Sequence, residues 1–146
     1  YANSLTSALS RLAKYPLEPA LLAASLRLLV VQHQIEVLCN KCRISFLPAG
    51  PLKKALWEQF GFTTESRLYR KGPGCQSCED GHNGTIMAAE WLPITHEFQQ
   101  LLATKADQQT IADYVAAHAG FAHDLGKLAS KGLISIDEAG RLAARR

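Results

Sequence analysis

Hydrophobic and polar positions follow two different periods in the first part of the chain. Four hydrophobic residues recur at helical spacing and predict a first helix: Leu5, Ala8, Leu9 and Leu12. Asn3 or Ser4 can cap the start of this helix, and Pro16 ends it. The pattern predicts a second helix over residues 18–29. Residues 30–38 alternate loosely and favour a strand.

The middle of the chain is rich in glycine and proline, which predict loops between short elements. A loop is predicted around residues 48–51, followed by a short amphipathic helix over residues 52–60 that stops at Gly61. Short strands are predicted over residues 67–70 and 85–92. The last third of the chain is then helical in character.

Capping residues divide this last third into four predicted helices. Thr95 and Asp107 can cap the first two, and residues 122–131 predict a third. Ser135 and Glu138 have the spacing of a capping box at the start of a fourth. The whole pattern therefore predicts a mixed fold that is mainly α.

Composition and charge narrow the function only slightly. The chain has 146 residues and a formal net charge of +3, whereas a nucleic-acid surface usually needs a dense basic stripe, so we expect no nucleic-acid partner. No run of about 18 apolar residues predicts a membrane span. The chain begins at Tyr1 and its only methionine is Met87, so we expect it to be a piece of a longer protein.

The four cysteines are the most informative residues. They form two C-x2-C pairs, Cys39 with Cys42 and Cys75 with Cys78. Each pair can present two thiolates to one ion, and two such knuckles complete a tetrahedral shell. We therefore predict a zinc site made by all four. Because four thiolates leave no position for water, the zinc is expected to be structural and not catalytic.

Two other readings of the cysteines stay open at this point. They could form two disulfides in an oxidising compartment, although nothing marks the chain as secreted. A redox-active C-x2-C of thioredoxin type needs only one pair and a βαβ context. Of the five histidines only His82 lies near a knuckle in the sequence, and the others are expected to be ordinary surface or capping residues: His33, His96, His118 and His123.

No motif for catalysis or nucleotide binding is found. The chain has no phosphate loop, because Leu128 follows Gly126-Lys127 where Ser or Thr is required, and no nucleophile elbow. We accordingly assign no catalytic and no cofactor-binding residue other than the four metal ligands. The chain is expected to be inactive alone.

Several segments together resemble one family, the type II secretion and type IV pilus assembly ATPases. The resemblance includes Leu38-Cys-Asn-Lys-Cys42 and Gly74-Cys-Gln-Ser-Cys78, and it extends over most of the chain. The further segments are residues 1–12, 17–26, 81–84 with Glu90, 93–102 and 132–138. The order of these parts is more specific than any one motif.

The resemblance implies a fold and a role. Residues 1–37 would end a RecA-like ATPase core, residues 38–92 would be the tetracysteine zinc-binding module, and residues 93–146 would be a C-terminal helical bundle. Members of the family are cytoplasmic hexamers that hydrolyse ATP with Mg²⁺ at the inner membrane. They drive pilus or pseudopilus assembly through a membrane platform protein. Their phosphate loop, acidic boxes and histidine box would all precede Tyr1.

The chain departs from the family pattern at a few positions. His33 and Glu36 stand where the family usually has arginines before the first knuckle, and Thr85 stands where another arginine is usual after the second. A histidine is common at the position of Tyr1. These departures weaken any expectation that this copy makes the usual charged subunit contacts.

Three functions remain to be compared. The first is the C-terminal part of such an ATPase, serving as a zinc-stabilised scaffold for subunit or platform-protein contacts. The second is an independent zinc-ribbon-like domain that binds nucleic acid, although the gap between the cysteine pairs exceeds the spacing of zinc ribbons. The third is a zinc-dependent enzyme, which a closed four-thiolate shell disfavours. We also expect the loss of one cysteine to unfold residues 38–90 while sparing the helical tail.

Overall fold

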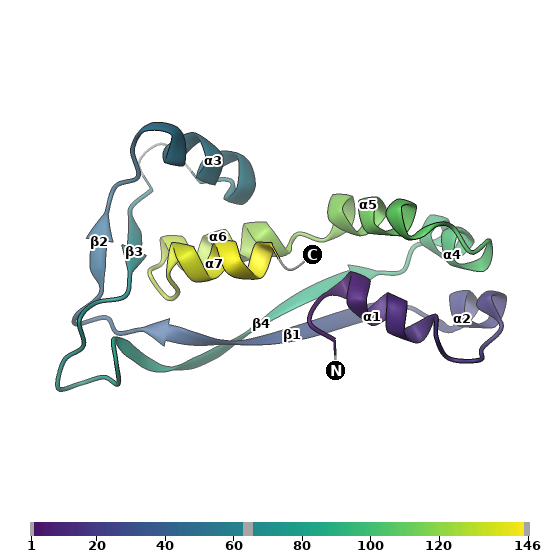
Figure 1. Ribbon diagram of the computed structural model, residues 1–146, viewed down its shortest axis with the longest axis horizontal. Coiled ribbons are helices and arrows are strands. Elements are labelled where there is room, and N and C mark those ends of the chain that lie inside the picture. The colour runs from purple at the N-terminus through teal and green to yellow at the C-terminus, as the bar shows by residue number, and fades with distance from the viewer. Residues whose placement is uncertain (1, 63–65, 145–146) are drawn as a thin grey trace. The chain divides into compact units, whose positions relative to one another are not determined.

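A computed structural model describes residues 2–62 and 66–144 of the chain (Figure 1). Tyr1, the position where a histidine is common, lies outside the described residues. The described residues form helices and strands in this order: α1 (Leu5–Leu12), α2 (Pro19–Ser25), β1 (Leu28–Leu38), β2 (Ile44–Phe46), α3 (Gly50–Phe60), β3 (Leu68–Arg70), β4 (His82–Pro93), α4 (His96–Ala103), α5 (Gln108–His118), α6 (Phe121–Ser130) and α7 (Ile136–Ala143). The fold is therefore mixed, with more helix than strand.

The chain forms two compact units, and each unit combines segments that are far apart in the sequence. Among the described residues, the first unit contains residues 2–33 and 89–120, and the second contains residues 34–88 and 121–144. The predicted helical tail is thus divided, because α4 and α5 belong to the first unit and α6 and α7 to the second. The domain boundaries predicted at residues 37 and 92 divide the chain into consecutive segments, and they stay a prediction.

A small hydrophobic core holds the first unit together. Its buried members include Leu5 and Leu9 of α1, Val31 of β1, Leu92 of β4 and Phe98 of α4. The alternating burial of β1 follows from its pleat, which turns every second side chain towards the core. In this unit α1 packs on α5, and α2 packs on α4.

Glu90 is a buried charged residue of this unit. It lies in β4 with a relative exposure of 2%, and its Oε2 atom accepts a hydrogen bond of 3.1 Å from the backbone N–H of Leu5. Leu5 is the first residue of α1, so the carboxylate meets the positive end of the helix dipole. Glu90 thereby attaches the start of α1 to β4.

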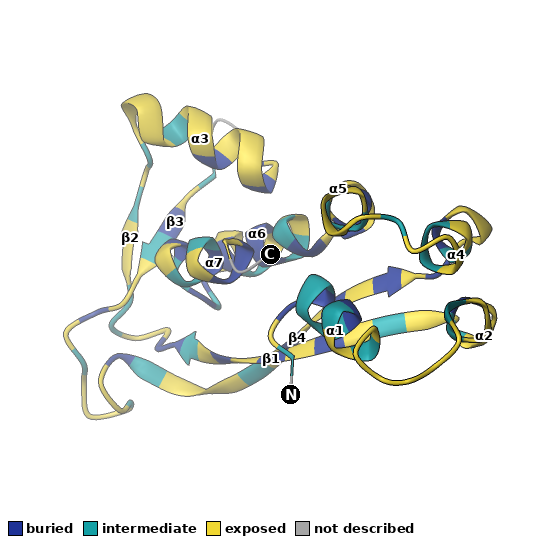
Figure 2. Ribbon diagram, turned by 45° about the vertical axis from the view of Figure 1, so that its right-hand side comes forward, coloured by how far each residue is buried: buried dark blue, intermediate teal, exposed yellow. Residues whose placement is uncertain are grey.

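A second core lies in the second unit and joins three helices. α6 packs against both α3 and α7, and β3 contacts α6 and α7. The buried residues include Leu56 and Phe60 of α3, Leu125 of α6 and Leu142 of α7. Figure 2 shows that α3 is mostly exposed apart from these buried positions, whereas α6 and α7 turn broad buried faces inward.

The caps predicted from the sequence are formed. The side chains of Ser4, Thr95, Asp107 and Ser135 each accept a hydrogen bond from a backbone N–H in the first turn of the helix that follows. The capping box predicted at Ser135 is only half formed. Ser135 accepts from the N–H of Glu138, while the Glu138 carboxylate accepts from the guanidinium of Arg141 at 2.7 Å.

Several predicted boundaries are wrong, and one strand was not predicted. β1 begins at Leu28 instead of residue 30, and β4 begins at His82 instead of residue 85. The second helix ends at Ser25 instead of residue 29, because the carbonyl of Arg27 accepts a 2.9 Å hydrogen bond from the N–H of Ile94 and the chain is already extended there. The loop predicted around residues 48–51 is in part the first turn of α3, where a proline is tolerated. Strand β2 was missed because it has only three residues and depends on pairing with β3.

No helix of the described residues is both long enough and apolar enough to cross a membrane.

Gly126 allows α6 and α3 to approach closely, and this contact can be tested. A Cβ at Gly126 would lie 2.7 Å from the carbonyl oxygen of Phe60, whereas a Cβ at Gly140 in α7 would meet nothing within 4 Å. We expect Gly126→Ala to destabilise the chain by about 1–3 kcal/mol through overpacking. We expect Gly140→Ala to stabilise it by up to about 1 kcal/mol through helix propensity. Urea unfolding of both variants measures this, and equal effects would contradict the close contact.

Candidate metal centre

The first knuckle follows directly from the end of β1. Cys39 comes immediately after Leu38, the last residue of the strand, and its N–H donates to the carbonyl of Gly81 at 2.8 Å. The N–H of Arg43 then donates back to the carbonyl of Cys39 at 2.9 Å, which closes the turn. The Cys39 side chain is fully buried, and Cys42 is half-buried. The end of the strand thus places the Cys39 thiol in the interior of the second unit.

The second knuckle is a tight turn in the loop before β4. The N–H of Cys78 donates to the carbonyl of Cys75 at 3.2 Å. The N–H of Cys75 donates to the Sγ of Cys78, also at 3.2 Å. A backbone donor aimed at sulfur favours the thiolate form over the thiol. Cys75 is exposed and Cys78 half-buried.

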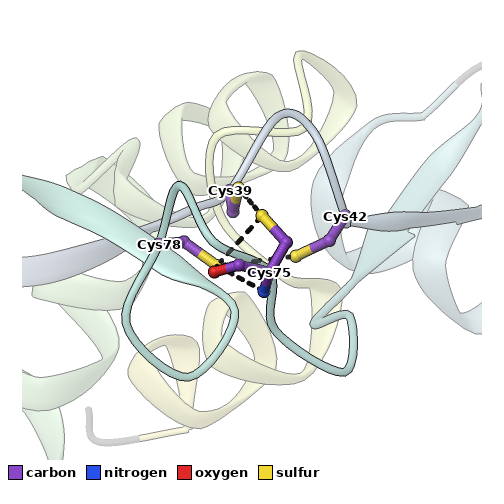
Figure 3. A group of neighbouring side chains, drawn as sticks. All are labelled: Cys39, Cys42, Cys75 and Cys78. Atoms are coloured by element: carbon purple, nitrogen blue, oxygen red, sulfur yellow. Dashed lines mark hydrogen bonds between the residues drawn. The ribbon is translucent and has the colours of Figure 1, made fainter.

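The two knuckles bring all four sulfur atoms together (Figure 3). The Sγ–Sγ distances are 3.8 Å between Cys39 and Cys75, 3.7 Å between Cys42 and Cys78, and 3.6 Å between Cys75 and Cys78. All four sulfurs lie within 4.8 Å of one another. A tetrahedral ion with metal–sulfur bonds of about 2.3 Å separates its ligand atoms by about 3.8 Å. The donor set and its spacing therefore fit a single tetrahedral metal ion.

The thiols influence one another's ionisation. The backbone N–H of Lys41 is the main cause that lowers the pKa of Cys39, to about 7. Burial, followed by hydrogen bonds with Cys78 and Cys39, raises the pKa of Cys42 to about 12. For Cys75 the N–H of Ser77 lowers the pKa, but Cys78, burial and Cys39 outweigh it and raise the pKa overall. A cluster of this kind cannot lose four protons unless a cation compensates the negative charge.

The other readings of the cysteines fit this geometry less well. A disulfide requires a sulfur–sulfur separation of about 2.05 Å, and the four cysteines here are free thiols. A redox pair does not require a second pair beside it. His82 does not join the cluster either, because its Nδ1 lies 3.6 Å from a carboxylate oxygen of Glu36. Within the described residues the ligand cluster consists of the four cysteines alone.

Polar and steric contacts connect the two knuckles directly. The Nζ of Lys41, inside the first knuckle, donates to the Oγ of Ser77, inside the second, at 2.8 Å. Gly72 approaches the first knuckle so closely that a Cβ there would lie 1.9 Å from the carbonyl oxygen of Cys42. Any larger residue at position 72 would push the second knuckle away. The Lys71 ammonium also bonds to the Asp80 carboxylate, which lowers the pKa of that carboxyl group.

Arg43 links the cysteine cluster to the turn between α6 and α7. Its guanidinium lies over the ring of Tyr69, 4.3 Å from the ring centroid. It also donates to the carbonyls of Lys131 and Gly132, the former at 3.3 Å. Beside it, the N–H of Leu38 donates to the carbonyl of Leu133 at 2.8 Å. The first knuckle is therefore attached to the last two helices by three hydrogen bonds.

The sequence predicted the four cysteines but not these supporting residues. Arg43 stands next to Cys42 in the sequence, yet its acceptors are about 90 residues away. The signal available in the sequence is Gly132, because a glycine marks a turn or a place of close approach. In the structure this glycine has a positive φ of 70°. Spacing within a knuckle is local, whereas these contacts depend on the tertiary fold.

Two of the departures from the family pattern contact side chains of the neighbouring strand. Glu36 lies beside His82, as described above, and the Nε2 of Gln34 donates to the Oγ1 of Thr85 at 3.3 Å. His33 is buried in β1. Two of the three expected arginine positions, those of Glu36 and Thr85, are therefore filled by residues that contact the opposite strand of the β1–β4 pair.

Comparison with known proteins gives a consistent picture. The family model of the type II/IV secretion system protein matches residues 1–141. The chain is 28% identical to a putative type II secretion system protein E of Escherichia coli over 76% of this chain and 22% of the relative. It is 33% identical to the type II secretion system protein E of Dickeya dadantii over 64% of this chain and 18% of the relative.

A third relative covers more of the chain. The type II secretion system ATPase E of Vibrio cholerae is 24% identical over 97% of this chain and 28% of the relative. The chain therefore spans about a fifth to a quarter of the length of the curated relatives that it matches.

Removal of the metal should affect the second unit as a whole. The sequence led us to expect that the helical tail would be spared, but α6 and α7 belong to the same compact unit as the knuckles. We expect a chelator to raise amide hydrogen exchange in residues 34–88 and also in α6 and α7, while α1, α4 and α5 keep their protection. Hydrogen exchange with mass spectrometry measures this. Unchanged protection in α6 and α7 would contradict the link through Arg43.

Proposed function

We propose a function from the premise that this chain belongs to the family of type II/IV secretion system proteins. In this proposal it is the C-terminal part of an ATPase that powers type II secretion or the assembly of a type IV pilus or pseudopilus. The observation that supports it most directly is the cluster of four cysteine sulfurs within 4.8 Å, at the positions that match the metal ligands of the family. One relative is itself named a secretion system ATPase.

Zinc is the ion that we propose for the cluster. A set of four thiolates in tetrahedral arrangement suits zinc or an iron–sulfur centre. Two C-x2-C knuckles that close on each other are typical of structural zinc. With four protein ligands the ion has no position for water or substrate, so the proposed role is structural and the chain contributes no catalytic residue through this site.

The proposed work of the zinc is to fix a scaffold. Cys39 holds the end of β1, while Cys75 and Cys78 hold the loop before β4. Arg43 and Leu38 extend this attachment to the turn between α6 and α7. A scaffold held in this way could present contact surfaces to neighbouring subunits or to the platform protein of the inner membrane.

ATP and Mg²⁺ belong to the longer protein in this proposal. The chain lacks a phosphate loop, so nucleotide would be bound by segments that precede it. We further propose that the longer protein forms a hexamer, that it is cytoplasmic and peripheral at the inner membrane, and that this chain makes no contact with nucleic acid. The names of the relatives support the secretion role in general terms.

Metal content is the direct test of the site. We expect elemental analysis of the purified chain to find one zinc and no iron for each chain, and a chelator to make all four thiols reactive towards a thiol reagent. The Cys75→Ser variant should lose most of the bound zinc. The Ser77→Ala variant, which removes only the bond to Lys41, is the matched control and should keep it. A chain with no metal and no free thiols would contradict the proposal.

The scaffold role can be tested separately in the longer protein. We expect Cys42→Ser there to abolish secretion or pilus assembly while nucleotide binding persists, because the phosphate-binding segments are outside this chain. Binding of a fluorescent ATP analogue and a secretion assay measure the two effects, with Ser77→Ala again as the control. Normal secretion by a zinc-free protein would show that the ion has no scaffold role, even if the chain binds zinc.

A further inference from the structure

The first unit contains a groove that the metal centre does not involve. It is formed by α1, the connection from α1 to α2 and the start of α2 on one side. The end of α4, the turn after it and the first half of α5 form the other side. Figure 1 shows these four helices together at one end of β1 and β4. The groove has a volume of about 850 Å³, which is in the range of ligand-binding clefts.

The lining of the groove is mainly apolar, with four uncharged polar residues and two lysines among its members: Thr6, Ser10, Gln108, Gln109, Lys14 and Lys105. Its larger apolar residues are Leu9, Leu12, Leu17, Leu22, Leu102 and Ile111. No aspartate or glutamate lines it. The groove therefore offers a hydrophobic floor together with an excess of positive charge.

The two lysines are not paired with a carboxylate in the part of the chain that the structure describes. Among the described residues neither Lys14 nor Lys105 forms an ion pair. The carboxylate nearest to Lys105 in the sequence is Asp107, whose oxygens already accept from the N–H and the hydroxyl of Thr110 at 3.0 and 2.6 Å, and the one nearest to Lys14 is Glu18, which forms no ion pair among the described residues. Both charges are thus available to an incoming acid.

Lys105 occupies a backbone position that favours glycine. Its φ is 54°, in the left-handed region where a side chain is strained. A lysine is nevertheless present, and it lines the groove. The position follows the last turn of α4, where the N–H of Ala106 donates to the carbonyl of Leu101 at 2.9 Å, so the helix terminus accounts for the backbone conformation.

Two large apolar side chains that line the groove are exposed. Tyr15 and Leu17, in the connection between α1 and α2, have relative exposures of 63% and 50%. Large exposed apolar residues that gather beside an apolar groove are typical of a surface that another molecule covers. Both would be shielded by an occupant of the groove.

We propose that this groove binds an amphipathic helix of a partner polypeptide, with the apolar face of that helix on the leucines and its carboxylates opposite Lys14 and Lys105. A helix is favoured over an extended peptide, because helices that line a groove offer no free strand edge for pairing. A helix satisfies its own backbone and needs only side-chain contacts. The uncompensated lysines select an acidic helix.

A designed peptide provides the probe for this proposal. The acidic peptide contains only Leu, Ala and Glu, with Leu at positions i, i+3, i+4 and i+7 and with a fluorescent label. Two comparison peptides replace Glu by Lys or scramble the Leu positions. We expect fluorescence anisotropy to show saturable binding of the acidic peptide alone, and we expect that binding to weaken with added salt. No binding of the acidic peptide, or equal binding of all three, would overturn the proposal.

Variants of the chain locate the binding to the groove. The Lys14→Gln and Lys105→Gly double variant removes both charges, and glycine suits the backbone at position 105, so the fold should persist. We expect it to bind about three- to tenfold more weakly, and Leu17→Ser to bind about tenfold more weakly. The control, Lys53→Gln with Lys54→Gln in α3 of the second unit, removes the same charge and should bind like the parent chain.

Three outcomes would place the helix elsewhere. Equal weakening by the Lys53 and Lys54 control would mean that net charge alone attracts the peptide. Unchanged binding by Leu17→Ser in a chain with normal circular dichroism would mean that the peptide does not contact the groove. Binding by this chain but not by the longer protein would mean that the groove is an internal seam covered by other segments. Each of these results overturns the proposal.

Discussion

The second unit depends on one constraint, the convergence of four cysteine sulfurs within 4.8 Å. Thiols are poor hydrogen-bonding partners for one another, and the surroundings of Cys42 and Cys75 raise the pKa of both thiols, whereas the N–H of Lys41 lowers that of Cys39. A divalent cation would stabilise the thiolates that it binds, so it would supply the partner that the sulfurs lack and would lower their pKa. The end of β1, the loop before β4 and the turn between α6 and α7 all take their positions from residues attached to this cluster.

The elements that the sequence predicted well are those that depend on near neighbours. Ser4, Thr95 and Asp107 cap helices through hydrogen bonds to residues three positions away, and such bonds leave a clear signal in the sequence. The end of α2 and the existence of β2 depend on partners far along the chain, Ile94 for the one and β3 for the other. Local patterns contain no information about those partners.

The same distinction applies to the candidate site. The C-x2-C spacing is local, so the four ligands could be predicted, and the structure brings those four together. Arg43 could not be recognised as a support, because a basic residue beside a knuckle is usually interpreted as a charge that promotes thiolate formation. Its guanidinium instead packs on Tyr69 and bonds to carbonyls of the α6–α7 turn. α6 and α7 belong to the same unit as the cysteine cluster, and no local pattern in the sequence predicts this.

The departures from the family pattern change the charge on the strand pair β1–β4. Glu36 lies beside His82, and Thr85 accepts a hydrogen bond from Gln34. Neither residue carries the positive charge that an arginine would place on this strand pair. Positive charge is present at Lys14 and Lys105, which line an apolar groove and have no counterion among the described residues. Because electrostatic attraction selects partners more than it strengthens their binding, this chain would choose its partners through a different surface.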